Sequence, residues 1–411
     1  MPNLTGLLGV IVLIALAWTI SENKRRFPLR LVIGGIGLQL ALALLLLTFP
    51  PVVAVFEWLA FGIARVISLA DEGIAFIFGR ELLDPSGPWG FVFLIKVLPV
   101  IIYFAALMAV LYHLRLMQPV VAGLAWLLRR SLGVSGPEAL AMAANVFVGQ
   151  TEAPLCVKPY LDKMSRAGLM TLMVGGFATI AGSVLAGYVN FLAPGGDEAE
   201  QAMWIRHLLT ASVMSAPAAF IMARVIVPEA EGDSGPDEAH MINESEAANF
   251  LDAASLGATD GLKLALNVGA MLIAFVSLLA LVNWPIQSLG EWGPVDSTLE
   301  SWGVESLDLQ TILGWAFAPL AWTMGVEWAD ASFIGRLMGE KVIATEFIAF
   351  VTLAEAANAE TPVISERSAA IAAYALCGFA NFGSVGIQIG GLSAIAPSRR
   401  KDFVSLALKA M

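Results

Sequence analysis

Long uninterrupted apolar runs dominate the hydrophobic pattern of this chain. Each run is long enough to cross about 30 Å of hydrocarbon, which takes roughly 20 apolar residues as a helix. Continuous runs lack the alternation of apolar and polar positions that membrane-spanning strands require. The pattern therefore predicts an all-α integral membrane protein. The predicted spans lie near residues 4–20, 31–50, 91–112, 167–193, 203–227, 264–282 and 368–396.

Two further apolar segments are interrupted and too short to span the membrane. The first, residues 135–157, opens with the capping box Ser135-x-x-Glu138, which starts a helix, and Pro154 helps to interrupt it. The second, residues 330–358, is broken near its middle. Both segments are expected to form helical hairpins that enter the membrane from opposite faces.

The chain also repeats a glycine-rich phrase. Residues 176–184 read GFATIAGSV, and residues 378–386 read GFANFGSVG. Upstream of each phrase, Leu-Ala-Trp, Gly-Val and Thr-Glu occur in the same order, which chance explains poorly. Three predicted spans separate the two Leu-Ala-Trp segments, so the second copy is expected to be inverted. Inverted repeats with broken segments are typical of secondary transporters, whose substrate site lies near the membrane midplane.

Charged residues are scarce and unevenly placed. Charged residues make up 14% of the chain, whereas soluble domains have about 25%. Hydrophobic residues make up 58%, whereas soluble domains have about 45–50%. Much of the net charge of -11 comes from the acidic segment 229–246, which is expected to be a solvated cytoplasmic loop. One topology puts every basic cluster in the cytoplasm and the N-terminus outside. These clusters lie at residues 24–30, 129–130, 158–166 and 399–401.

No residue pattern indicates an enzyme. Cys156 and Cys377 have neither metal-ligand nor disulfide-framework spacing, and the three histidines are scattered. A phosphate-binding glycine loop and a nucleophile paired with a base are both missing from the sequence. We therefore expect neither catalysis, an ATP-driven pump, an organic cofactor nor a nucleic-acid partner.

The acids at the two breaks, Glu152 and Glu346, have two interpretations. Each could cap a restarted helix, which stabilises a carboxylate by perhaps 0.3–1 kcal/mol. A carboxylate at membrane depth costs roughly 2.5–3.5 kcal/mol, so capping alone does not offset the cost. A functional role at a shared aqueous cavity is the favoured interpretation.

The repeated phrase has the same two interpretations. Small residues such as Gly182, Ser183 and Gly187 let transmembrane helices approach closely. Packing does not explain why the fourth position keeps a side-chain oxygen, as Thr179 and then as Asn381. A helix that unwinds there frees carbonyl oxygens, and together these are ligands for an alkali cation or a polar solute.

The motifs GQTEAPL at 149–155, GFATIAGSV, TEF at 345–347 and CGFANFGSVGIQIGGLSAIAP at 377–397 resemble those of the concentrative nucleoside transporter family. The match in motif order covers residues 91–411. The resemblance implies a homotrimeric, ion-coupled nucleoside importer with eight transmembrane helices, the eighth beginning after residues 399–401. It further implies an elevator mechanism, in which a domain holding both hairpins slides against a scaffold that includes helices 91–112 and 264–282.

The resemblance also implies roles for individual residues. Gln150, Thr151 and Glu152 would read the nucleobase, with Val184 packed against it. The ribose hydroxyls would be held by Glu346, Asn381 and Ser384, while Phe379 lines the same pocket. Sodium would be bound by the side chains of Asn145 and Thr179 and the carbonyls of Val148 and Ile180. Thr345 stands where the family has asparagine, so hydrogen bonding near the ribose is expected to differ.

Alternatives remain open from the sequence. Some members of the family couple transport to protons instead of sodium. A secondary transporter for another small polar solute would have the same hairpins. A channel is disfavoured because the broken segments suggest an occluded site. Uridine is favoured as substrate, although purine or pyrimidine preference stays open. Residues 1–90 are expected to form two opening helices and an interfacial helix, and residues 91–134 a scaffold helix with an interfacial helix. The first repeat core is expected at 135–228, followed by the acidic loop with an interfacial helix at 229–261. A second scaffold helix is expected at 262–284, and the second repeat core at 308–411.

Overall fold

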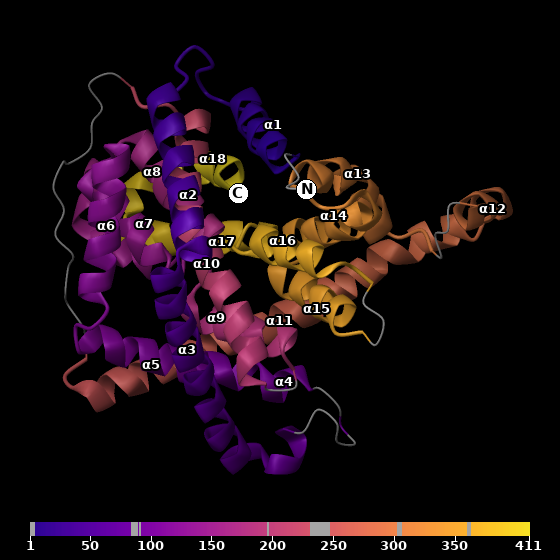
Figure 1. Cartoon of the computed structure of the whole chain (residues 1–411), viewed down its shortest axis with the longest axis horizontal. Coiled ribbons are helices and arrows are strands. Elements are labelled where there is room, and N and C mark those ends of the chain that lie inside the picture. The colour runs from indigo at the N-terminus through magenta and orange to yellow at the C-terminus, as the bar shows by residue number, and fades with distance from the viewer. Residues whose placement is uncertain are drawn as a thin grey trace. The chain divides into compact units, whose positions relative to one another are not determined.

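A computed structural model describes residues 5–83, 89, 92–194, 197–230, 247–301, 306–359 and 363–411, without the side chains of residues 298 and 300. Within these ranges every regular element is a helix, so the all-α prediction is confirmed (Figure 1). The acidic segment lies outside the described residues apart from 229 and 230. The helices are α1 (Thr5–Thr19), α2 (Leu29–Thr48), α3 (Pro50–Phe78), η1 (Arg80–Leu83), α4 (Phe93–Lys96), α5 (Leu98–His113), α6 (Gln118–Leu132), α7 (Gly136–Asn145), η2 (Ala153–Lys163), α8 (Arg166–Ala178), α9 (Gly182–Leu192), α10 (Glu198–Ile226), α11 (Phe250–Gly290), α12 (Gly293–Ser301), α13 (Leu309–Thr323), α14 (Trp328–Ile343), α15 (Glu346–Ala357), α16 (Glu366–Leu376), α17 (Phe382–Ile395), η3 (Pro397–Arg399) and α18 (Arg400–Ala410).

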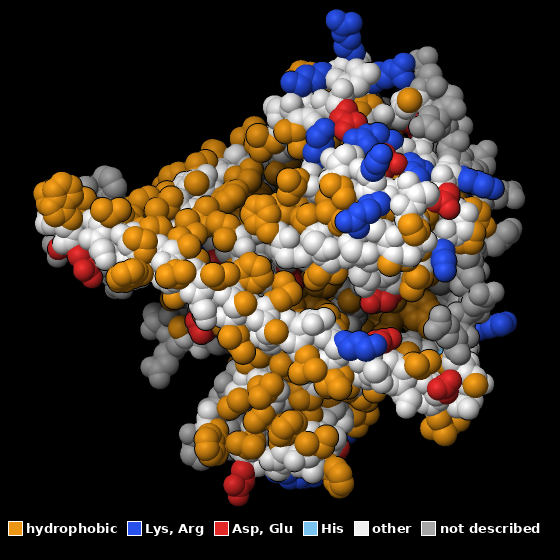
Figure 2. Space-filling view, turned by 180° about the vertical axis from the view of Figure 1, so that it is seen from behind, with side chains coloured by type: hydrophobic (Ala, Val, Ile, Leu, Met, Phe, Trp, Pro, Cys, Tyr) orange, Lys and Arg blue, Asp and Glu red, His pale blue; other side chains and the backbone are white. Residues whose placement is uncertain are grey.

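Among the described residues, six helical stretches are long and apolar enough to cross a membrane. Hydrophobic side chains cover much of the face shown in Figure 2, as expected where lipid replaces water. The six stretches are Leu29–Thr48, Pro50–Phe78, Phe93–His113, Arg166–Leu192, Glu198–Ile226 and Phe250–Gly290.

The helix α3 was not predicted as a span, because its charged residues interrupt the apolar pattern. In the structure it runs for 29 residues beside α10. Its Glu57 accepts a hydrogen bond from Arg206 at 2.8 Å, and its Arg65 bonds Glu198 at 3.0 Å, both across to α10. These pairings between helices accommodate the charges that break the pattern in the sequence.

The chain divides into two compact units. Unit 1 comprises Met1–Leu13, Asn267–Leu376 and Asn381–Gly383, and unit 2 comprises Ile14–Leu266, Cys377–Ala380 and Ser384–Met411. In unit 1, α14 packs along α13 and folds back on α15 as a hairpin (Figure 1). In unit 2, α10 packs on α2, α3 and α8, while α7 folds back on η2 as the other hairpin.

The repeat seen in the sequence is a repeat of structure. Helix α6 is followed by its C-cap Gly133, whose φ of 65° only glycine adopts readily, and then by a hairpin and the broken helix α8/α9. Helix α13 is followed in the same way by Gly325, at φ 100°, a hairpin and the broken helix α16/α17. Both hairpins and both breaks occur in the predicted segments.

The predicted capping box at the start of α7 is wrong in its chemistry. Ser135 does occupy the N-cap, but its side chain makes no capping hydrogen bond. Glu138 instead accepts two hydrogen bonds of 2.9 Å from Arg224 of α10, and both side chains are buried. A buried guanidinium pairs with a carboxylate more strongly than a backbone amide does, so the ion pair determines where Glu138 points.

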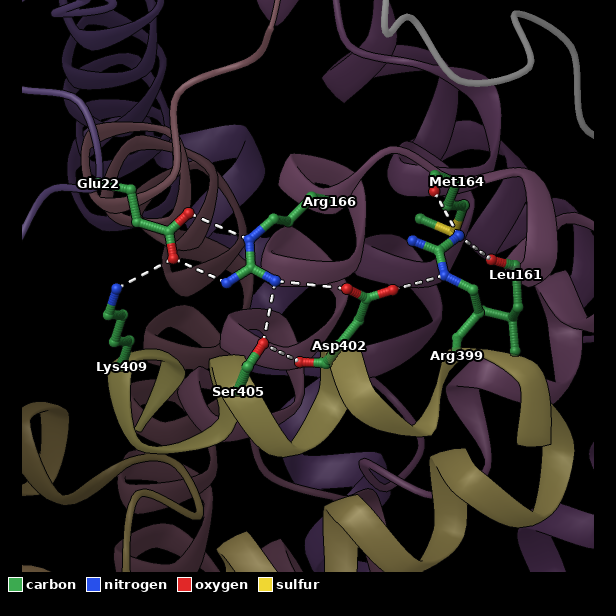
Figure 3. Close-up of polar contacts among 8 residues, drawn as sticks. All are labelled: Glu22, Leu161, Met164, Arg166, Arg399, Asp402, Ser405 and Lys409. Carbon is green, nitrogen blue, oxygen red and sulfur yellow. Dashed lines mark hydrogen bonds and ion pairs between the residues drawn. The ribbon is translucent and has the colours of Figure 1, made fainter.

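A second cluster of charged side chains joins the end of the first hairpin to the C-terminal helix within unit 2 (Figure 3). Arg166, the first residue of α8, contacts Glu22 at 2.8 Å and Asp402 of α18 at 3.4 Å. Arg399 binds the other oxygen of Asp402 at 2.8 Å and donates to the Met164 carbonyl beyond η2. Three stretches of the chain that are distant in sequence, around residues 22, 164–166 and 399–409, are thereby joined by one connected set of ion pairs and hydrogen bonds.

Glu22 is the acceptor shared by two cations of this cluster, since Lys409 also donates to it at 3.0 Å. The hydrogen bonds from Arg166 and Lys409 lower the pKa of Glu22 from 4.5 to about 2, against a partial desolvation that acts in the opposite direction. A carboxyl with a lowered folded-state pKa stabilises the fold above its unfolded pKa, and that stability is lost as pH falls toward the folded value.

We therefore expect Glu22→Gln to lower the midpoint of thermal unfolding at pH 7 by about 2 °C, because the cluster is partly exposed. The difference from the unmodified protein should shrink as pH falls from 4.5 toward 2. Tryptophan fluorescence during heating in detergent measures the unfolding midpoint at pH 7 and its change with pH. Glu72→Gln, in an exposed pair with Arg80, is the matched control and should shift nothing. If the difference in unfolding midpoint between Glu22→Gln and the unmodified protein stays the same at low pH, ionised Glu22 does not stabilise the fold.

Candidate functional site

The tip of the first hairpin presents three polar residues in succession. Helix α7 ends at Asn145 and η2 begins at Ala153, with Pro154 in its first turn. Between them, Gln150 is buried, whereas Thr151 is half-buried and Glu152 is exposed. The Thr151 hydroxyl donates to Glu152 at 3.0 Å. The tip therefore combines an amide, a hydroxyl and a carboxylate within three residues.

The break in α8/α9 lies against this tip. Helix α8 ends at Ala178, and Thr179 is extended, with φ -120° and ψ 163°. Gly182, the first residue of α9, donates its backbone N–H to the Phe147 carbonyl of the hairpin at 3.1 Å. Val184, two residues later, is buried. The predicted unwinding at Thr179 is confirmed.

Asn145 carries an unpaired buried amide beside this break. Its side chain is fully buried, and neither its oxygen nor its nitrogen has a hydrogen-bond partner among the described residues. It lies against Gly175, whose carbonyl accepts the Thr179 hydroxyl at 2.9 Å. Unpaired buried amides are costly, so each one requires an explanation.

Oxygen atoms that could ligate a cation lie on the segments next to this amide in the chain and at the break. Thr179 uses its proton on Gly175, which leaves the lone pairs of its hydroxyl oxygen available. The non-helical residues that follow include Ile180, and the hairpin turn includes Val148. Side-chain and carbonyl oxygens of this kind suit a hard cation such as Na⁺. The four predicted sodium ligands are therefore in one unit, and their chemistry fits the ion.

The second break crosses the first. Gly378 has φ 122°, and a Cβ there would lie 2.5 Å from the Phe177 carbonyl oxygen, so no other residue fits. Further along, Gly391 of α17 lies against the methyl group of Thr151. The chain at Gly378 thus touches the end of α8, and Gly391 touches the first hairpin tip. Cys377–Ala380 and Ser384–Met411 belong to unit 2, and they include the half-buried Phe379 and the buried Ser384.

The tip of the second hairpin holds a buried carboxylate in unit 1. Glu346 is the first residue of α15 and is only 2% exposed. It accepts a hydrogen bond of 2.6 Å from the Asn381 amide. Thr345 sits at the N-cap, but its buried hydroxyl neither caps the helix nor finds another partner among the described residues. Glu346 and Asn381, predicted as partners in substrate binding, therefore lie in direct contact.

Sequence analysis missed one buried polar residue of α17 in unit 2. Gln388 of α17 is 1% exposed and donates its amide N–H to the Met173 carbonyl of α8 at 3.0 Å. The sequence feature that could have identified Gln388 is its place within the apolar stretch GIQIGG, because a polar side chain inside a membrane helix needs a hydrogen-bond partner.

Comparison with known proteins gives consistent results along the whole chain. An uncharacterized transporter of Haemophilus influenzae is 41% identical over 100% of this chain and 94% of its own. Three family models match: Na+ dependent nucleoside transporter N-terminus over residues 8–81, Nucleoside recognition over 94–195, and Na+ dependent nucleoside transporter C-terminus over 207–411. This chain belongs to the Na⁺-dependent nucleoside transporter family. The resemblance found in the motifs is thereby confirmed.

Other members of the family are similar over the same length. The sodium/nucleoside cotransporter 1 of Rattus norvegicus is 38% identical over 100% of this chain, which spans 61% of that longer protein. The solved structure of CNTnw in an inward-facing substrate-bound state matches with a TM-score of 0.89 and 40% identity, covering 100% of this chain and 95% of CNTnw. A CNTnw variant in an outward-facing state matches with a TM-score of 0.87. The protein is thus a multi-pass membrane transporter and not an enzyme.

Proposed function

We propose that this protein imports uridine-like nucleosides with Na⁺ across a bacterial inner membrane, as a homotrimer with a periplasmic N-terminus. The observation that carries the proposal is the buried contact between Glu346 and Asn381 at the second hairpin tip. An ionised carboxylate only accepts hydrogen bonds, and the vicinal hydroxyls of ribose donate them. Glu346, Asn381 and Ser384 bind the ribose in this proposal.

The nucleobase is assigned to the first hairpin tip. Its edge presents adjacent donors and acceptors, and the amide of Gln150 offers both functions. Thr151 and Glu152 add a hydroxyl and a carboxylate to the same turn. Val184 and Phe379 supply the apolar surfaces against which a flat base packs.

Sodium is assigned to Asn145, Thr179 and the carbonyls of Val148 and Ile180. The unpaired buried amide of Asn145 supports this assignment, because a bound cation would satisfy its oxygen. The ion contributes positive charge beside the break, and the chain contributes only neutral oxygens. A bound ion would link the turn of the first hairpin to the end of α8.

The transport movement is proposed to be of the elevator type. Similarity to CNTnw in inward-facing and outward-facing states supports an alternation between these two states. A domain holding both hairpins would move against a scaffold that includes helices near 91–112 and 264–282. Acidic substrates are disfavoured because the proposed site contains two carboxylates.

Uptake of labelled uridine into proteoliposomes tests the function. We expect uridine to accumulate when an inward sodium gradient is present and to equilibrate slowly when choline replaces sodium. Accumulation that ignores sodium but follows an inward proton gradient would replace sodium by proton coupling. A protein that takes up neither uridine nor any purine nucleoside would refute the nucleoside assignment.

A further inference from the structure

Ser212 places a hydroxyl group near the middle of the apolar helix α10. The residue is fully buried, and a buried hydroxyl inside a membrane helix needs a hydrogen-bond partner. Serine often finds that partner on its own helix, as Ser215 does by donating to the Ala211 carbonyl at 2.8 Å. Ser212 instead donates to the Val146 carbonyl of the first hairpin at 3.1 Å. Its hydroxyl therefore joins two elements of unit 2 that are distant in sequence.

Val146 belongs to the turn that follows α7. The helix ends at Asn145, so the carbonyls after it must find partners elsewhere. The Val146 carbonyl is bonded to Ser212 of α10. The Phe147 carbonyl accepts the backbone N–H of Gly182, the first residue of α9, at 3.1 Å. Two successive carbonyls are thus held by two different helices, which fixes the path of the turn between them.

This turn carries two of the four proposed sodium ligands. The Asn145 side chain comes directly before Val146, and the Val148 carbonyl comes directly after Phe147. The amide of Asn145 is fully buried and has no hydrogen-bond partner among the described residues. Its position therefore depends on the backbone that carries it, and the bonds at Val146 and Phe147 hold that backbone.

We propose that Ser212 is a positioning residue for the sodium site, because it holds the turn in which Asn145 and Val148 present their oxygens to the ion. The inference rests on the proposed function, from which it takes the sodium ligands. The Ser212 hydroxyl acts through the Val146 carbonyl and is not itself a ligand. Without this hydroxyl, the carbonyl loses its donor inside a buried turn, and the turn relaxes. Sodium must then restore the geometry as it binds, which lowers its affinity.

Ser212→Ala tests the inference, because it removes the hydroxyl and leaves the rest of the side chain. The measurement is the midpoint of thermal unfolding in detergent without uridine, while NaCl replaces choline chloride at constant ionic strength. A ligand that binds only the folded state raises the midpoint once its concentration exceeds its dissociation constant. We expect this rise to begin at a sodium concentration about fivefold higher in the variant, the value of one net hydrogen bond.

Uridine uptake gives a second measurement of the same effect. The sodium concentration for half-maximal uptake should rise about fivefold in Ser212→Ala. The apparent affinity for uridine at saturating sodium should stay within about twofold, because Ser212 does not touch the substrate in this proposal. Should Ser212→Ala fail to fold, Ser212→Cys keeps a similar size and a weaker S–H donor, and a rise of about twofold in the sodium requirement is expected.

Ser215→Ala is the matched control. Ser215 lies one turn further along α10, and its hydroxyl bonds within that helix. Its removal should leave the sodium dependence of both measurements unchanged.

Two outcomes would overturn the inference. If Ser212→Ala lowers the midpoint by the same amount at every sodium concentration, Ser212 supports the fold alone and the proposed sodium site stands. If the midpoint and the uridine uptake of the unmodified protein both ignore sodium, the sodium site itself is refuted, and the positioning role with it. Uptake of uridine in that second case would still support a nucleoside transporter.

Discussion

Replacing Glu346 with glutamine is expected to weaken uridine binding about 100-fold, because the carboxylate proposed to accept from the ribose hydroxyls becomes a neutral amide. The carboxylate is 2% exposed and is held by Asn381 at 2.6 Å, so water cannot substitute for it. Isothermal titration of the purified protein with uridine in saturating sodium measures the affinity. The same variant should lose most of its discrimination between uridine and its deoxyribose analogues, since the group left unpaired by a missing hydroxyl is then uncharged.

Glu340→Gln is the control for this substitution. Glu340 is an equally buried glutamate of the same unit, but it lies on α14 and bonds Arg336 at 2.9 Å. Its substitution should leave uridine affinity within about twofold of the unmodified value. Unchanged affinity in Glu346→Gln would remove Glu346 from the substrate site, and equal losses in both variants would indicate a general effect of removing buried charge.

The helical architecture could be predicted from the sequence because hydropathy and helix breaks are local signals. The break at Thr179 follows from a glycine-weakened helix, and the structure places it there. The length of α3 could not be predicted, because its charges are compensated by Arg206 and Glu198 of another helix. Such compensation depends on which helices become neighbours, and that is a property of the folded chain.

The same limit applies to the site. Glu152 and Glu346 occupy equivalent places in the repeat, and the sequence treats them alike. In the structure Glu152 is exposed and bonded to its neighbour Thr151, whereas Glu346 is buried and bonded to Asn381, 35 positions away. Burial depends on what covers each tip, which the repeated motif does not encode. Gln388 was missed for the same reason, since its partner Met173 is 215 positions away.

Replacing Thr179 with valine is expected to raise the sodium concentration for half-maximal uridine uptake by about 10- to 100-fold, the cost of removing one oxygen ligand from a cation. The substitution keeps the branched shape and removes the hydroxyl whose proton is already used on Gly175. Uptake at saturating sodium should recover, because the substrate contacts are unchanged. Initial rates measured across a series of sodium concentrations at fixed ionic strength give the value directly.

Thr171→Val separates ligation from packing. Thr171 lies on α8, which ends one residue before Thr179. It is fully buried and donates to the Ala167 carbonyl at 3.0 Å, just as Thr179 donates to Gly175 at 2.9 Å. The two threonines differ in position, because only Thr179 adjoins the unpaired amide of Asn145 through Gly175. We expect Thr171→Val to leave the sodium dependence unchanged and Thr179→Ser, which restores the hydroxyl, to bring it back. Equal sodium dependence in Thr179→Val and Thr171→Val would mean that Thr179 only packs, and would remove it from the proposed sodium site.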